Sequence, residues 1–191
     1  MSGRLTVLAG PSGVGKGSVI EAVRRRHPHI WLSTSVTTRP PRQGETEGVQ
    51  YHFVDQAEFD WMVEAGELLE YDAHLSACYG TPRGPVEEQL ASGGPALLEI
   101  DLHGARQVRR AMPEAQLVFL APPSFEELAR RLVGRGTEDA PHVQERLELA
   151  REELAAEGEF DVVIVNDDVE RAADALVALL LRSDARPADL E

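Results

Sequence analysis

Cysteine is almost absent from this chain of 191 residues, in which Cys78 stands alone. A single cysteine excludes an internal disulfide, and a chain without disulfides is compatible with a reducing compartment. No base is evident beside Cys78 in the sequence, so we expect a small, partly buried side chain and not a reactive thiol.

Long apolar runs are also missing. The longest, such as residues 178–181, are far shorter than the roughly 20 residues that a membrane-spanning helix needs. The chain reaches its first apolar stretch by Leu5, with no basic-then-apolar leader before it. We therefore expect a cytoplasmic protein without a membrane partner.

Positive charge is scarce. Asp and Glu outnumber Lys and Arg by 33 to 19, which gives a net charge of −14. This balance argues against a broad basic face and thus against nucleic acid as a partner. High-salt habitat and simple solubility both fit the acidity. Arginines nevertheless cluster at 39/42 and 130/131/135, which favours small phosphorylated ligands, whereas those at 24–26 read as a solvated helix face.

Short apolar stretches alternate with segments of helical periodicity along most of the chain. The stretches at 4–9, 96–100, 116–121 and 161–165 have the length of buried strands, and helical spacing follows each of them. This alternation predicts the α/β class, with a parallel sheet flanked by helices. No internal repeat or low-complexity segment is present.

Residues 35–93 interrupt that alternation and read as a small mixed α/β insertion. Residues 33–48 show no period and predict a loop, while short strands are expected at 51–54 and 68–73. Between them, Asp55 and Glu58 form a capping-box pattern for a helix that Gly66 closes.

A glycine-rich turn follows the first strand and carries the strongest motif. It fits the G-x-x-x-x-G-K pattern, in which backbone N–H groups and the start of the next helix surround phosphate oxygens. Lys16 supplies a positive charge for the β- and γ-phosphates of ATP. The residues of this predicted ATP-binding loop are Gly10, Pro11, Ser12, Gly13, Val14, Gly15, Lys16, Gly17 and Ser18.

The position after the lysine departs from the pattern. A Ser or Thr that reaches Mg²⁺ normally stands there, but this chain has Gly17, with Ser18 one step later. We therefore expect Mg²⁺ to be bound with ATP, held by the nucleotide and water, and assign no protein metal ligand. Asp101 ends the strand at 96–100, where it can act on the magnesium side, cap the next helix, or do both.

The segment after the first helix resembles the GMP-binding region of guanylate kinases. The resemblance rests on residues 35–45, 48–53, 70–71 and 79–82, and continues through 100–105, 135–138 and 165–168, so that it spans about residues 4–182. It implies a P-loop NTPase type of fold with a core at about 4–34, 94–133 and 157–182. The GMP-binding insertion would be about 35–93, the lid about 134–156, and residues 183–191 a polar tail.

The resemblance also implies residue roles on the GMP side. Arg39 and Arg42 would grip the GMP phosphate, because planar guanidinium forks suit bidentate contacts. Glu70 would accept from guanine N1–H and the 2-amino group, a donor pair that adenine lacks. The implied GMP-binding set is Ser35, Arg39, Arg42, Tyr51, Glu70, Tyr79, Thr81 and Asp101.

On the ATP side the resemblance implies Arg131, Arg135, Arg146 and Asn166. Lys16, Arg135, Arg146 and Arg42 would be the catalytic residues, neutralising charge during direct in-line transfer. The insertion and the lid would close to exclude water. His103 and residues 75–78 depart from the family pattern.

The implied reaction is ATP-dependent phosphorylation of GMP, and of dGMP, in purine nucleotide recycling. The substrates ATP and GMP are then the only partners expected. Another small phosphate acceptor remains open within the same fold. A scaffold-type module that binds phosphopeptides without catalysis is the alternative from a different class; the intact phosphate loop argues against it.

Overall fold

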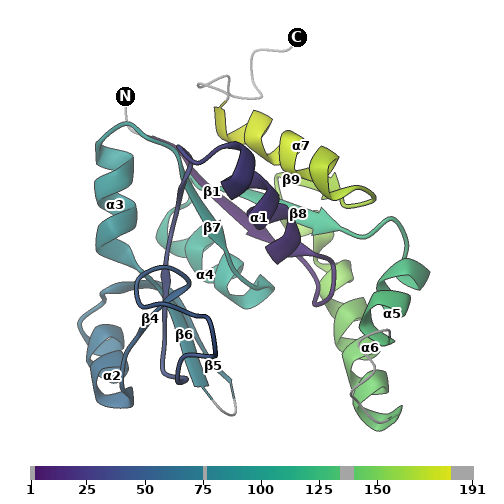
Figure 1. Cartoon of the computed structure of the whole chain (residues 1–191), viewed down its shortest axis with the longest axis horizontal. Coiled ribbons are helices and arrows are strands. Elements are labelled where there is room, and N and C mark those ends of the chain that lie inside the picture. Colours follow the sequence, from purple (N-terminus) through teal and green to yellow (C-terminus); the bar gives the residue numbers. More distant parts are fainter. Residues whose placement is uncertain (1–2, 75–76, 134–139, 182–191) are drawn as a thin grey trace. The chain divides into compact units, whose positions relative to one another are not determined.

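The computed structural model describes residues 3–74, 77–133 and 140–181 (Figure 1). The chain forms two compact units. The first unit contains residues Met1–Ala9 and Trp31–Leu117, and the second contains residues Gly10–Ile30 and Val118–Glu191.

Three parallel strands in the order β2-β7-β1 form one layer of the first unit. Their bounds are Leu5–Ala9 for β1, Trp31–Leu32 for β2 and Ala96–Glu99 for β7. All five residues of β1 are buried, as expected for a parallel strand covered on both faces. Helix α3 (Arg83–Ala91) contacts β7, and α4 (Leu102–Ala111) contacts β1.

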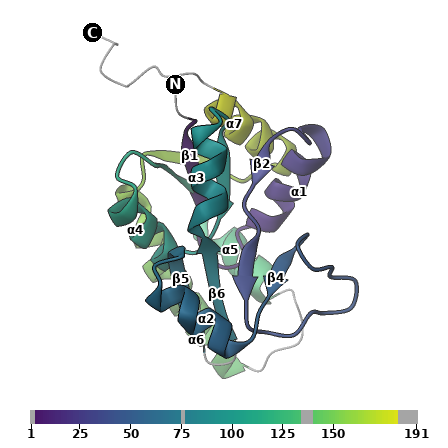
Figure 2. The ribbon, with the colours of Figure 1, turned by 90° about the vertical axis from the view of Figure 1, so that its left-hand side faces the viewer.

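A second sheet of the first unit has the strand order β4-β3-β6-β5. Its strands are β3 (Ser35–Thr37), β4 (Tyr51–Phe53), β5 (Leu68–His74) and β6 (Ala77–Pro82). β3 runs parallel to β4, whereas β6 is antiparallel to both β3 and β5. Helices α2 (Gln56–Glu64) and α4 both contact β5, next to which they lie in Figure 2.

Helix α2 begins where the capping pattern predicts. The Asp55 carboxylate accepts from the Glu58 backbone N–H at 2.8 Å, and Gly66 follows the helix with a positive φ of 73°. Phe59 is buried with Val36 and Leu68, and the half-buried Cys78 packs against this cluster, as expected for a small apolar side chain. The cluster ties α2 to the second sheet.

The second unit combines helices with the parallel pair β8 (Gln116–Ala121) and β9 (Val162–Val165). Its helices are α1 (Lys16–Arg26), α5 (Phe125–Val133), α6 (Ala140–Ala155), η1 (Glu157–Glu159) and α7 (Val169–Leu181). Helices α1 and α7 pack side by side (Figure 1), and Arg25 and Arg26 of α1 form ion pairs with Glu170 of α7. Asp168 caps α7, accepting from the Arg171 N–H at 2.9 Å.

The predicted α/β class and the main strands are confirmed, with boundaries shifted by about one residue. The loop expected over 33–48 is wrong in part, because Ser35–Thr37 forms β3. Only Val36 of this three-residue strand carries an apolar signal, and its pairing with β4 and β6 depends on residues distant in sequence. Strand β6, which pairs with β3 and β5, was not predicted for the same reason. Helix α3 was not predicted either. Within the segment expected as the lid, helix α6 begins at Ala140, and residues 134–139 lie outside the described residues.

Candidate active site

The glycine-rich turn wraps around the N-terminus of α1 as expected for a phosphate-binding loop. Gly15 caps the helix in the left-handed conformation, with φ 100°. A side chain there would also collide with Asn166, because a Cβ atom would lie 2.7 Å from its Nδ2. Glycine is therefore required at this position by both backbone conformation and space.

Lys16 begins helix α1 and its ammonium group reaches back across the turn. Nζ donates to the Gly10 carbonyl at 2.6 Å and to that of Pro11 at 3.5 Å. Lys16 is the only lysine in the chain, so this loop holds the only side-chain ammonium group. The N-terminus of helix α1 adds its own partial positive charge. The ammonium group and the helix N-terminus together make an anion-binding site.

A pocket of about 490 Å³ opens beside this turn. Asn166 is one wall: it is 2% exposed, and its Nδ2 donates to the Val14 carbonyl at 2.8 Å. Arg131 is another, donating to the carbonyls of Val14 at 3.2 Å and Asn166 at 3.3 Å. The lining residues are Gly13, Gly15, Ser18, Arg131, Asn166, Asp167 and Val169.

The structure thus brings together much of the predicted ATP-binding set and adds residues that sequence reasoning missed. Asp167 and Val169 line the pocket, and Glu153 of α6 accepts from the Ser12 backbone N–H at 3.0 Å. Asp167 lies in the motif at 165–168, which is the signal that points to it. No sequence signal marks Glu153, because it is one acid among many on a charged helix.

Two predicted lid residues have different outcomes. Arg146 lies on α6 with a half-buried side chain. Arg135 lies outside the described residues. Gly17 and Ser18 are exposed in the first turn of α1, and Ser18 lines the pocket.

In the first unit, Glu70 of β5 is a carboxylate that is only 6% exposed. The Thr81 hydroxyl of the paired strand β6 donates to its Oε1 at 2.6 Å. Its Oε2 lies against Gly104 of α4, where a Cβ would be 2.6 Å away. Asp101 caps α4 by accepting from the Gly104 N–H at 2.7 Å, so its expected role as a helix cap is confirmed.

Burial raises the pKa of Glu70 to about 7. The Thr81 hydrogen bond opposes this shift, whereas the carboxylates of Asp101 and Asp72 add to it. A buried acid with a single side-chain hydroxyl donor suits a ligand that brings further N–H donors.

The remaining predicted GMP-binding side chains gather around Arg39. Its guanidinium carbon lies 4.9 Å from the Tyr51 ring centroid, and the rings of Tyr51 and Tyr79 are 5.9 Å apart. Tyr79 also interacts electrostatically with Arg39. Ser35 pairs with Tyr51 in the strand register, which places it beside the same group. Arg42 is exposed on the loop that follows.

Within the described residues, no cluster of three or more His, Cys, Asp and Glu side chains has the arrangement of a metal site. None of the helices in residues 3–74, 77–133 and 140–181 is long and apolar enough to span a membrane.

Comparison with known proteins supports one family throughout the chain. The guanylate kinase family model matches residues 2–183. Guanylate kinases from Frankia casuarinae and Thermobifida fusca are each 64% identical, covering 94% and 93% of this chain and 97% and 90% of those proteins. The crystal structure of guanylate kinase from Anaplasma phagocytophilum aligns with a TM-score of 0.72 at 36% identity, covering 94% of this chain and 85% of that one.

The phosphate-binding loop, the buried Glu70 and the Arg39 group stand within the matched residues. The match extends over nearly all of the chain and of its relatives. The chain belongs to the guanylate kinase family.

Proposed function

We propose that this protein transfers the γ-phosphoryl group of ATP to GMP, and to dGMP, giving ADP and the nucleoside diphosphate. The observation that carries the proposal is the buried Glu70 carboxylate beside Thr81. Guanine offers adjacent N1–H and 2-amino donors to such an acceptor, and adenine does not. An adenine base would leave the carboxylate desolvated without a matching donor pair, which penalises its binding.

ATP binds at the glycine-rich turn, with its phosphates on the backbone N–H groups and on Lys16. Arg131 and Asn166 shape the adjoining pocket and position the nucleotide. Arg135 and Arg146 supply further positive charge to the transferring group. These groups act by electrostatic stabilisation, since phosphoryl transfer requires little covalent chemistry from the protein.

Mg²⁺ fits this site as a companion of ATP. Ser18, a residue whose side chain carries a hydroxyl oxygen, lines the pocket, and this hard cation prefers oxygen ligands. When bound, Mg²⁺ neutralises charge on the phosphates. Asp167 lines the same pocket and is ion-paired with Arg171 at 2.6 Å. The nucleotide and water would supply the remaining ligands of the ion.

GMP binds through Glu70, Thr81 and Ser35 at its base and through Arg39, Arg42, Tyr51 and Tyr79 at its phosphate. No general base is required, because the phosphate that attacks is already anionic near pH 7. Water must be excluded during transfer, because it would otherwise compete with GMP for the phosphoryl group. Transfer is direct and in line.

The test is an ADP-release assay with ATP and Mg²⁺ against GMP, dGMP, AMP, CMP and UMP, with an ATP-only control. Fast turnover with the guanine nucleotides alone is the expected result. Turnover with another acceptor would reject the base pocket. Nucleotide binding without turnover would reject the enzyme and favour a binding module.

A further inference from the structure

Arg39 is held by one carboxylate through both ends of its guanidinium fork. Its terminal nitrogens donate to Glu45 Oε2 at 2.6 Å and to Oε1 at 2.7 Å. The Arg39 and Glu45 side chains are only 12% and 17% exposed, so this pair is far better shielded than an ordinary surface ion pair. Their two parallel bonds fix the plane of the guanidinium as well as its place.

Aromatic and backbone groups complete the enclosure of this cation. The guanidinium carbon lies 4.9 Å from the Tyr51 ring centroid and 5.8 Å from that of Phe53. One terminal nitrogen also donates to the Pro40 carbonyl at 3.1 Å. A free arginine loses much rotamer entropy when it binds an anion, but here that loss is already incurred in the folded chain.

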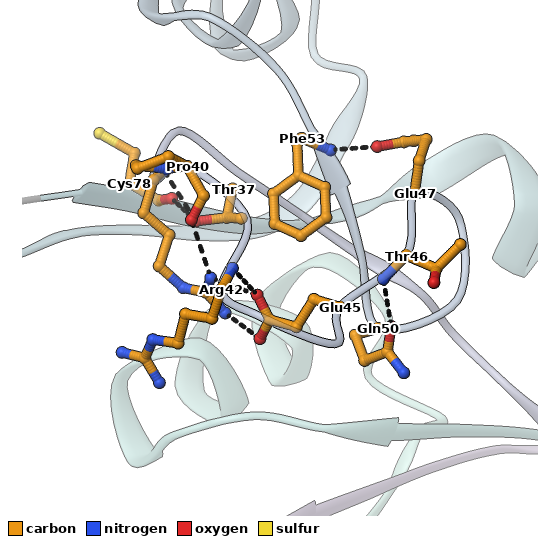
Figure 3. A network of polar contacts seen from close by, with 10 residues as sticks. Thr37, Pro40, Arg42, Glu45, Thr46, Glu47, Gln50, Phe53 and Cys78 are labelled. Atoms are coloured by element: carbon orange, nitrogen blue, oxygen red, sulfur yellow. Dashed lines mark hydrogen bonds and ion pairs between the residues drawn. The ribbon is translucent and has the colours of Figure 1, made fainter.

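The Glu45 carboxylate also contacts the second arginine of the loop, Arg42, at its backbone N–H group. Glu45 Oε2 accepts from the Arg42 N–H at 2.8 Å, and the Glu45 N–H donates to the Arg42 carbonyl at 3.0 Å. Glu45 thus joins the side chain of Arg39 to the main chain of Arg42. Figure 3 shows the Glu45 carboxylate beside Arg42. The turn between these arginines has its conformation fixed by this one acidic side chain.

The negative charge of Glu45 and its hydrogen bonds have opposite effects on anion binding by Arg39 and Arg42. An acid beside two arginines lowers their combined charge and so weakens their attraction for an anion. It also occupies one edge of the Arg39 fork, which a ligand then cannot use. The four hydrogen bonds that join Glu45 to Arg39 and Arg42 favour the ordering effect as the stronger one.

We propose that Glu45 is a positioning residue for the acceptor phosphate, which holds Arg39 and the Arg42 backbone in their binding orientation without touching the substrate. This inference rests on the proposed function, in which Arg39 and Arg42 bind the phosphate of GMP. Glu45 then contributes to recognition of the phosphate and not of the guanine base.

The test compares Glu45→Ala and Glu45→Gln with wild type, using Glu47→Gln as the matched control. Glu47 lies in the same loop and holds the Phe53 N–H and the His52 ring, each at 2.8 Å, but neither arginine. KM and kcat are measured for GMP and ATP. Calorimetry gives the affinities for GMP and for guanosine, which has the base without the phosphate. Circular dichroism confirms that each variant is folded.

Glu45→Ala is expected to raise KM and Kd for GMP about 10- to 100-fold, the range of a lost charge-assisted hydrogen-bond set. Its kcat should change less than threefold, and guanosine affinity and KM for ATP should not change. The KM and Kd of Glu45→Gln for GMP should lie between those of wild type and Glu45→Ala, because an amide keeps one acceptor oxygen. Glu47→Gln should match wild type.

Tighter GMP binding in the Glu45 variants would show that Glu45 competes with the phosphate, and would overturn the proposal. Unchanged GMP binding, or an equal loss for guanosine, would overturn it as well. Wild-type protein that fails to phosphorylate or bind GMP would reject the proposed function together with this role. Normal wild-type turnover with unaffected Glu45 variants would reject this role alone.

Discussion

Gly104 provides the space that the Glu70 carboxylate occupies. A Cβ atom at Gly104 would lie 2.6 Å from Glu70 Oε2 and 3.1 Å from its Cδ, closer than packed atoms approach. Asp101, which caps the same helix through the Gly104 N–H, keeps this backbone from retreating. The buried acid thus depends on a glycine 34 residues later in the chain, on a different element.

Gly104→Ala should therefore displace Glu70 and raise KM for GMP at least about tenfold, as expected when a buried hydrogen bond to a charged group is lost. The free energy of unfolding should fall by only about 1 kcal/mol, because the higher helix propensity of alanine offsets part of the cost of the clash. Gly84→Ala in α3 is the control, since a Cβ there meets nothing within 4 Å. Steady-state kinetics decide, and an unaltered KM for GMP would disprove the close-packing argument.

The raised pKa of Glu70 predicts a pH-dependent stability. Burial raises this pKa from its ordinary 4.5 to about 7, so the folded protein binds a proton that the unfolded chain releases. The resulting stabilisation is complete below about pH 4.5 and is lost as pH rises through about 7. Since one pKa unit corresponds to about 1.36 kcal/mol, the effect is on the order of 3 kcal/mol.

Urea unfolding of wild type and Glu70→Gln at steps from pH 4.5 to 7.5 measures this effect. The difference between the two proteins cancels the contribution of the other carboxylates. The stability of wild type relative to Glu70→Gln should fall steadily with rising pH. A difference that stays constant across the range would mean that Glu70 titrates alike in the folded and unfolded states.

Lys16 can be modified selectively, because it is the only lysine in the chain. An amine-directed acylating reagent should inactivate the protein in proportion to its addition at Lys16, and ATP should protect it. Intact-mass and peptide-mass spectrometry measure the addition at Lys16, and an activity assay measures the inactivation, each with and without ATP. Acylation of the α-amino group alone is the internal control. Full activity after complete acylation of Lys16 would exclude its ammonium group from the reaction.

Lys16→Met removes the same charge genetically. The loss of one electrostatic contact in the transition state typically lowers kcat by about 10²- to 10³-fold. GMP affinity by calorimetry should be retained, as should the melting temperature within a few degrees. A variant with wild-type kcat would rule out the proposed mechanism.

Asn166 supports the phosphate-binding loop through a buried hydrogen bond, and its loss should reduce both stability and ATP binding. Asn166→Ala leaves the Val14 carbonyl with only the Arg131 contact and should lower the free energy of unfolding by about 1–3 kcal/mol. Asn166→Asp should be worse, because an ionised carboxylate cannot donate to that carbonyl. Urea unfolding and KM for ATP test both variants. Greater stability of Asn166→Asp than of Asn166→Ala would contradict this account.

Local sequence was sufficient wherever a short pattern specifies its own structure. The turn at 10–18 needs only its glycines and the helix start, and α2 begins at Asp55 as its capping pattern indicates. The strands at 96–99 and 116–121 are continuous apolar runs, so they too were predicted from local signals.

Prediction failed where a residue acquires its environment from a distant segment. Strand β3 depends on pairing with β4 and β6, and Ser35–Thr37 has too few apolar positions to indicate it. Glu153 contacts the Ser12 N–H across 141 residues of sequence, so its own helix gives no hint of that contact. Glu45 lies close to Arg39, but the sequence does not show that both oxygens of its carboxylate would face the fork.

The sequence by itself determined the fold class, the phosphate-binding loop and the family, because these are written in hydrophobic period, glycine spacing and ordered motifs. Only the tertiary structure decided which acid is buried and what surrounds it. Burial of Glu70 arises where β5, β6 and α4 meet, and desolvation there, not the identity of the residue, raises its pKa. Side-chain environment is a property of packing, and packing is set by segments that are far apart in the chain.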